Sequence, residues 1–197
     1  HAGVEAAWAA AHALGPGGRV VLLTMDPSRI GVMSCNPAIG GLAKGQVVRE
    51  IDALGGVMGL AADASGIMFK VLNQSKGPAV RGPRAQCDRE IYAATVQRLI
   101  ASCDRIEVLA ATVDDILVEN GRCVGVRLPA GAGAVEADLD IPERWSPVYP
   151  SAPASPGATP LDVRAGAVVL TTGTFMRALM HTGERSTPGG RAGEGTA

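Results

Sequence analysis

One cysteine of the chain stands where a reactive thiolate would be favoured. Cys35 belongs to the glycine-rich segment SCNPAIGG at 34–41, between a predicted strand at 19–24 and a predicted helix at 44–54. Backbone N–H groups and the positive end of a helix dipole favour the ionised form of a thiol. We therefore interpret Cys35 as a candidate catalytic residue, with inert packing as the alternative. The remaining cysteines lack this context and are assigned to packing: Cys87, Cys103 and Cys123.

A second candidate site is a run of cations in the segment SKGPAVRGPRAQCDR at 75–89. Fixed cations in a loop stiffened by two prolines suit an anionic cofactor or a substrate phosphate. The alternative is a solvated basic face paired with neighbouring carboxylates. The cations are Lys76, Arg81, Arg84 and Arg89, the prolines are Pro78 and Pro83, and the carboxylates are Asp88 and Glu90.

The start of the chain contains part of a dinucleotide-binding pattern. The sequence His1-Ala2-Gly3 enters an alanine-rich helix predicted at 4–14, and the strand at 19–24 follows. A glycine is needed there because the backbone must approach a pyrophosphate and because the helix must pack closely on the neighbouring strand. The position of the usual acidic ribose contact falls at Thr24 or Asp26. An ordinary helix start is the alternative, and Gly173, directly after a predicted strand at 163–170, favours the cofactor interpretation.

The remaining pattern predicts an α/β fold. A strand is predicted at 67–72 and a long helix at 85–100, with Ile91, Thr95 and Leu99 on one face. From Ile106 onward three strands, at 106–110, 112–120 and 122–128, form a small antiparallel sheet with a hairpin at Asn120-Gly121. Seven of the thirteen prolines fall in 129–161, which we interpret as a Pro/Ala-rich insertion.

Composition excludes several functional classes. The chain has 197 residues, 47% hydrophobic, with 18 basic and 19 acidic residues and a formal net charge of −1. These values exclude disorder of the whole chain and disfavour a protein that coats nucleic acid through many cations. Aromatic residues at 3% disfavour binding of single strands by stacking. No metal site is predicted, because His12 and His181 have no companions at ligand spacing.

The setting of the chain can also be predicted. No signal peptide or membrane-spanning run is visible, and no C-x-x-C pair is present. We therefore expect a cytoplasmic protein without a membrane partner. The chain starts at His1 and ends shortly after a glycine-rich turn, so we expect a partial domain, 1–197, truncated at both ends.

Five strings in the chain resemble the flavin domain of the GidA family, also called MnmG. They are HAGVEAA, MSCNPAIGGLAKGQVVREIDALGG, KVLNQSKGPAVRGPRAQCDR, VVLTTGTF and GGRAGE, in this order. The similar stretches cover nearly all of the chain except the segment from 129 to about 161. The resemblance implies a Rossmann-like FAD-binding domain of the glutathione-reductase type with a small inserted antiparallel sheet.

The resemblance also implies an activity. The family works with a partner GTPase, MnmE, to place a carboxymethylaminomethyl-type group on C5 of the wobble uridine of tRNA, using FAD, NADH and a folate one-carbon donor. A homodimer is expected for the full-length protein. Cys35 matches a cysteine that the family is thought to use in catalysis.

Cofactor contacts follow from the same resemblance. His1, Ala2 and Gly3 would end the FAD pyrophosphate loop, and Val113 and Ala197 match further FAD-contact positions. Additional candidates for cofactor binding are Asn36, Gly40, Gly41, Lys76, Arg81 and Gly173. Two alternatives stay open, namely a different FAD-dependent oxidoreductase acting on a small molecule and a non-catalytic fragment.

Overall fold

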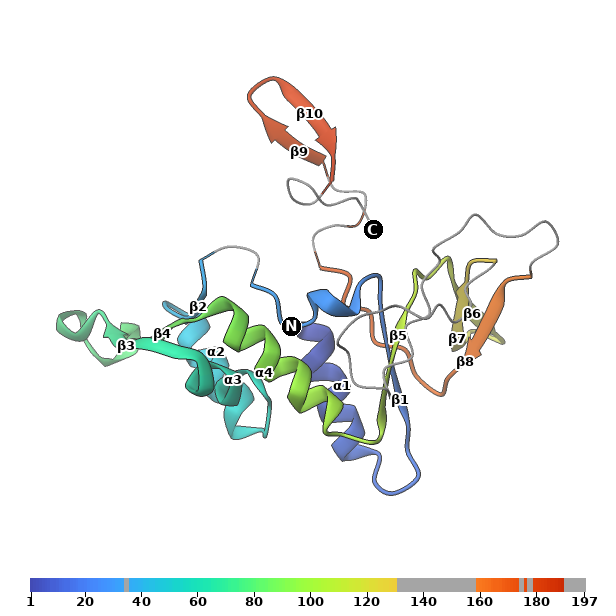
Figure 1. Ribbon diagram of the computed structural model, residues 1–197, viewed down its shortest axis with the longest axis horizontal. Coiled ribbons are helices and arrows are strands. Elements are labelled where there is room, and N and C mark those ends of the chain that lie inside the picture. The colour runs from blue at the N-terminus through green and yellow to red at the C-terminus, as the bar shows by residue number, and fades with distance from the viewer. Residues whose placement is uncertain (34–35, 131–158, 174–175, 177–178, 190–197) are drawn as a thin grey trace.

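The computed structural model describes residues 1–33, 36–130, 159–173, 176 and 179–189 (Figure 1). Two predicted site residues, Cys35 and Ala197, and most of the predicted insertion therefore lie outside the described residues. Helix α1 (Ala2–Ala13) lies beside the paired strands β1 (Val20–Thr24) and β5 (Ile106–Ala110), and a second group of helices and strands lies on the other side of α1 (Figure 1).

Strands β1 and β5 form a parallel pair. Val20 lies opposite Ile106 and Thr24 opposite Ala110, and Val108 on the buried face of β5 is only 1% exposed. The prediction that 106–110 belongs to the antiparallel sheet is therefore wrong. Parallel pairing needs a long crossover, which the intervening helices and strands supply. Strand β1 is also less buried than predicted, since Val21 is 38% exposed.

A three-stranded antiparallel sheet lies between β1 and β5 in the sequence. Its strands are β2 (Ala38–Gly40), β3 (Gly66–Leu72) and β4 (Gly82–Cys87), in the order β2-β4-β3. Helices α2 (Lys44–Ala53) and α3 (Met58–Ser65) pack on it. Short 3-10 turns at Gln74–Lys76 (η2) and Pro78–Val80 (η3) connect β3 to β4. The sequence predicted α2 and β3, but it did not predict α3.

Helix α4 (Arg89–Ala101) starts later than predicted. Residues 82–87 pair with β3 instead of entering the helix, and the Asp88 carboxylate starts α4 by accepting the N–H groups of Glu90 and Ile91, both at 2.9 Å. Such a cap satisfies donors that have no partner inside the helix. Of the predicted face, Ile91 is 48% exposed, whereas Thr95 is buried and Leu99 packs against the main core. Tyr92, Val96 and Ile100 supply the rest of the buried face.

A second, small antiparallel sheet contains β6 (Asp115–Glu119), β7 (Arg122–Leu128) and β8 (Leu161–Arg164) in that order. The predicted Asn120-Gly121 hairpin is confirmed: both residues have positive φ, 51° and 75°, as a tight I′-type turn requires. The predicted strand at 163–170 is wrong beyond Arg164. Ala165 donates its N–H to Val124, the chain bends at Gly166, and Val169 and Leu170 are 67% and 60% exposed.

The last described segment is a hairpin of β9 (Leu179–Thr182) and β10 (Arg185–Pro188), which projects away from the rest of the chain (Figure 1). The main core gathers buried side chains from α1, α3, α4 and β5, and Ala111, Val126 and Leu128 form a second core under the small sheet. Within the described ranges, no helix is both long and apolar enough to cross a bilayer.

Candidate cofactor-binding site

A cavity of about 170 Å³ lies where the N-terminus of α1 meets the carboxyl end of β1. Three stretches that are distant in sequence contribute to it: the start of α1, the segment from β1 to Gly31, and Thr171. The lining residues are His1, Gly3, Val4, Leu22, Leu23, Thr24, Arg29, Ile30, Gly31 and Thr171. The structure thus brings together His1, Gly3 and Thr24, which the sequence singled out.

At Gly3 the first turn of α1 closely approaches the segments that face it. A Cβ atom at this position would lie 2.9 Å from Thr171 Oγ1 and 3.5 Å from Leu22 Cδ1. A larger side chain would therefore fill the space between the helix and the two segments that face it. The first turn of a twelve-residue helix presents N–H groups and a positive partial charge, which stabilise an anion.

The only acidic residue of the first turn of α1, Glu5, is directed away from this cavity. Its carboxylate accepts the N–H of Val57 at 3.1 Å and the N–H of Met58 at 2.8 Å, at the start of α3. Two charge-assisted hydrogen bonds hold the side chain there. The sequence showed an acidic residue in a first turn but gave no sign of this long-range contact.

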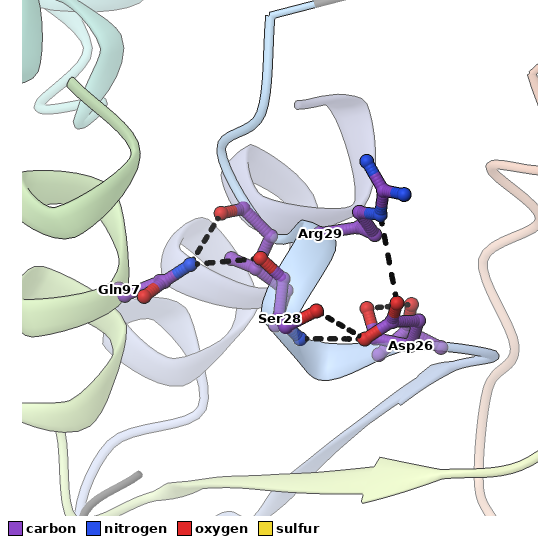
Figure 2. A network of polar contacts seen from close by, with 6 residues as sticks. Asp26, Ser28, Arg29 and Gln97 are labelled. Atoms are coloured by element: carbon purple, nitrogen blue, oxygen red, sulfur yellow. Dashed lines mark hydrogen bonds and ion pairs between the residues drawn. The ribbon is translucent and has the colours of Figure 1, made fainter. Parts of the chain in front are cut away.

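The two candidates for the ribose position differ in the structure. Thr24 lines the cavity, whereas Asp26 does not. Figure 2 shows the Asp26 carboxylate turned toward its own 3-10 turn, η1 (Pro27–Arg29), where Oδ1 accepts the N–H and O–H of Ser28 at 2.9 and 2.6 Å. Its Oδ2 lies 3.6 Å from Arg29 Nε. Asp26 therefore shapes the turn that borders the cavity.

Helix α4 holds the same turn from the other side. The Gln97 amide donates to the carbonyl oxygens of Ser28 and Ile30 at 3.2 and 3.0 Å (Figure 2). Arg29, Ile30 and Gly31, which this turn positions, line the cavity and were missed by sequence reasoning. The Asp-Pro-Ser start of the turn is the one sequence signal that could have identified them.

Val113 and Gly173 lie near the same edge without lining the cavity. Ala111 donates its N–H to the Thr24 carbonyl at 2.9 Å, so the chain after β5 passes along the end of β1, and Val113 follows with 43% of its surface exposed. Gly173 is exposed, has a φ of +66° and lies two residues after Thr171. Both remain candidates for cofactor contact.

The predicted basic loop lies away from the cavity at Gly3. Lys76 and Arg81 lie in the connection between β3 and β4, far from the N-terminus of α1 (Figure 1). Arg81 Nε donates to the Gln74 carbonyl at 3.2 Å, and the Gln46 amide of α2 donates to the Arg81 carbonyl at 3.3 Å. Arg81 therefore braces its own loop, while the Lys76 side chain is exposed. The structure does not bring these cations to the cavity.

The glycines at 40 and 41 have a packing explanation. Gly40 has a φ of +90°, and a Cβ atom there would lie 2.2 Å from the Pro83 carbonyl oxygen, which accepts the N–H of Gly41 at 2.8 Å. Only glycine permits this approach of β2 to β4. Asn36, just before β2, is exposed. A cofactor contact of these residues stays a prediction.

The other cysteines fit the packing assignment. Cys87 is 1% exposed within the main core, Cys103 and Cys123 are partly buried, and all three are free thiols. In the part of the chain that the structure describes, no group of three or more His, Cys, Asp or Glu side chains could hold a metal ion.

A glycine at the first turn of a helix, a parallel strand pair and a third segment meeting at the strand ends define the Rossmann-like α/β class of nucleotide-binding domains. This confirms the fold class predicted from the sequence. The chain belongs to the family described as Glucose inhibited division protein A, whose model matches residues 1–138 and 157–197.

Several relatives and solved structures agree with this assignment. The chain is 44% identical to the tRNA uridine 5-carboxymethylaminomethyl modification enzyme MnmG of Rhodopirellula baltica, over all of this chain and 27% of that protein. It is 43% identical to the enzyme of the same name from Bacteroides thetaiotaomicron, over 98% of this chain and 26% of that one. The chain thus spans about a quarter of the length of these relatives.

Two crystal forms of Aquifex aeolicus GidA have the same fold. Each superposes on the whole chain with a TM-score of 0.74 at 40% identity, and the match covers 27% of that protein in form II and 28% in form I.

Proposed function

We propose that the protein containing this chain is an FAD-dependent enzyme that modifies the wobble uridine of tRNA by adding a carboxymethylaminomethyl-type group at C5. The single observation that supports the cofactor part is the glycine in the first turn of α1, beside the cavity, where a Cβ atom would lie only 2.9 Å from Thr171 Oγ1. The names of the relatives support the tRNA part.

The residues present fit the pyrophosphate of a flavin dinucleotide. The backbone of Ala2 and Gly3 at the N-terminus of α1 would hold the negative charge, and His1 and Thr24 border the same cavity. Val113, Gly173 and Ala197 are proposed as further contacts. When bound, the flavin supplies the transfer of electrons, and NADH is its proposed reductant.

Cys35 is the proposed catalytic residue. Its thiolate would act on the uracil ring, as a nucleophile or as a proton-transfer group. Asn36 follows it directly, Gly40 and Gly41 lie further along the same glycine-rich segment, and all three would shape the backbone beside the reacting ring. Lys76 and Arg81 would contribute positive charge for phosphate groups of the cofactor or of tRNA.

The remaining components of the reaction are also proposals. A folate would donate the one-carbon unit, an MnmE-type GTPase would act as the partner, and the full-length protein would form a homodimer. We expect the enzyme to act in the cytoplasm, where its tRNA substrate is found.

One experiment tests the cofactor and the chemistry together, using the full-length protein. Bound flavin is measured by absorbance, and tRNA-dependent NADH oxidation and uridine modification are measured in the same preparations. Gly3→Val is expected to lose most of the bound flavin, because the added side chain meets Thr171. Cys35→Ala is expected to keep its flavin and lose modification. Cys103→Ala, a partly buried thiol at the end of α4, is the matched control and should keep both.

Each alternative gives a different result. Normal modification by Cys35→Ala would remove the catalytic assignment. NADH oxidation that depends on a small molecule and not on tRNA would identify a different oxidoreductase. A full-length protein that binds no flavin would support the non-catalytic interpretation.

A further inference from the structure

One face of the sheet β2-β4-β3 is covered by helices, and the other carries cations. Successive side chains of a strand point to opposite faces. Ala85 and Cys87 of β4 are buried on the face toward α3, where Cys87 Sγ lies 3.9 Å from the Ala62 carbonyl oxygen. The row Ile39, Ala85 and Phe69 lies on this face, and Phe69, on the edge strand β3, is 61% exposed. The next row, Gly40, Arg84 and Lys70, therefore points to the opposite face.

Lys70 and Arg84 lie directly opposite each other across β3 and β4. The Cβ atoms of such cross-strand pairs are about 5 Å apart, and two like charges at that separation destabilise the sheet. Neither cation has a carboxylate within ion-pair distance among the described residues. No ion pair within the described part of the chain therefore offsets this repulsion, although Asp52 and Asp63 border the same cavity of about 330 Å³ as the two cations.

The neighbouring strand leaves the Arg84 guanidinium accessible. Gly40 is its partner on β2, and a Cβ atom built on Gly41 would lie 3.8 Å from Arg84 Nη1. Because glycine has no side chain, neither Gly40 nor Gly41 covers the guanidinium. Lys70 is exposed and Arg84 is half-buried, so the pair combines a fixed planar donor with a flexible ammonium.

We propose that Lys70 and Arg84 together bind a backbone phosphate of the RNA substrate on this face of the sheet. A phosphate between the two cations would accept hydrogen bonds from both and remove their mutual repulsion. This inference rests on the proposed function, because that function supplies the RNA. None of the residues of this face lines the cavity at Gly3, so the pyrophosphate of the flavin has a separate place.

The test measures the affinity of the full-length flavoprotein for fluorescently labelled, unmodified tRNA by anisotropy at several salt concentrations. Lys70→Gln and Arg84→Gln should each weaken binding about ten-fold. Each should also lower the slope of log affinity against log salt by about 0.7 to 0.9, the value of one phosphate contact. Arg122→Gln is the matched control: it removes the same charge from an exposed position on β7 and should leave affinity and slope unchanged.

A charge reversal separates binding from folding. Lys70→Glu places a carboxylate opposite Arg84, so thermal unfolding should occur at the same or a higher temperature, while tRNA affinity falls further than in Lys70→Gln. A merely structural lysine would not give this opposite response. Arg84→Lys, which keeps the charge, should recover part of the affinity.

Three outcomes would overturn the proposal in distinguishable ways. If the wild-type protein binds tRNA and both glutamine variants bind it equally well, the pair does not contact RNA and the proposed function stands. If the variants lose flavin but keep RNA affinity, the pair serves the cofactor. If the wild-type protein binds no tRNA, the proposed function fails together with this inference.

Discussion

At the scale of single residues, Glu5 has the most consequential contact that the sequence did not reveal. Its side chain leaves α1 and accepts two backbone N–H groups at the start of α3. Helix α3 has no side-chain cap from its own N-cap residue, Val57. A residue more than fifty positions earlier in the chain therefore caps this helix and ties it to α1.

Replacing Glu5 by Gln should lower the free energy of unfolding by about 1 to 2 kcal/mol, since one acceptor and the charge that favours a helix N-terminus are lost. Urea denaturation measures this change. Glu184→Gln, in the exposed turn of the β9–β10 hairpin, is the control and should change little. Equal stability of the Glu5 variant would mean that α3 does not depend on this cap.

Single residues also show how far the candidate site could be predicted. His1, Gly3 and Thr24 were accessible to prediction, because a glycine before a helix and the end of the following strand have fixed roles in a dinucleotide-binding fold. Thr171, Arg29 and Gln97 were not. Their roles come from contacts between distant segments, which no local pattern encodes.

At the scale of elements, local sequence patterns predicted individual helices and the hairpin well, but they predicted poorly which strands pair with each other. Helices α1 and α2 and the hairpin of β6 and β7 follow from alanine content, helical spacing and the Asn-Gly turn. The β4–α4 boundary was wrong because 82–87 finds a strand partner in β3, a tertiary contact that overrides helix propensity. Strand β5 was assigned to the wrong sheet because its partner, β1, is distant in the sequence and no local pattern indicates the pairing.

One ion pair between elements makes stability depend on pH. Arg127 of β7 lies opposite Asp162 of β8, and its Nε and Nη2 donate to the two carboxylate oxygens at 2.8 and 3.1 Å. The hydrogen bond from Arg127, together with its charge, lowers the pKa of Asp162 below its ordinary value of 3.8. The ionised carboxylate is thus favoured in the folded state.

Because the pKa of Asp162 is lower in the folded state, the ion pair stabilises the fold at pH values above 3.8, the ordinary pKa. This stabilisation is lost as the pH falls from 3.8 through the pKa of the folded state. Asp162→Asn should therefore be less stable than wild type near neutral pH, and the difference should shrink on acidification. Urea midpoints between about pH 6 and about pH 3 measure this. Parallel curves for the two proteins would exclude the linkage. Asp63→Asn serves as the control for lost charge, because Asp63 forms no ion pair with the described residues.

At the scale of the whole molecule, the two proposed anion-binding surfaces lie on different elements. The cavity at Gly3 lies at the end of the β1–β5 pair, and the cationic face lies on the sheet β2-β4-β3 (Figure 1). If both proposals hold, the anionic cofactor and the phosphates of RNA would be bound by different elements of one chain.

The parallel pairing of β1 with β5 has a consequence for the order in which the chain folds. Val20 meets Ile106 only after the intervening residues have been brought together, and closing so long a loop costs entropy before the strands gain contacts. The hairpin of β3 and β4 and the adjoining helices α3 and α4 are closer in sequence and can form first.

Mutations in these two regions should therefore affect different rate constants, that of folding or that of unfolding. Val96→Ala, in α4, should slow folding, whereas Val108→Ala, in β5, should mainly accelerate unfolding, although both side chains are 1% exposed. Stopped-flow measurements in urea separate these effects, and a folding rate lowered equally by both would place β5 in the nucleus. Because the end of β1 lines the cavity at Gly3 and β1 pairs with β5, the cofactor site would be the last part of the domain to be assembled.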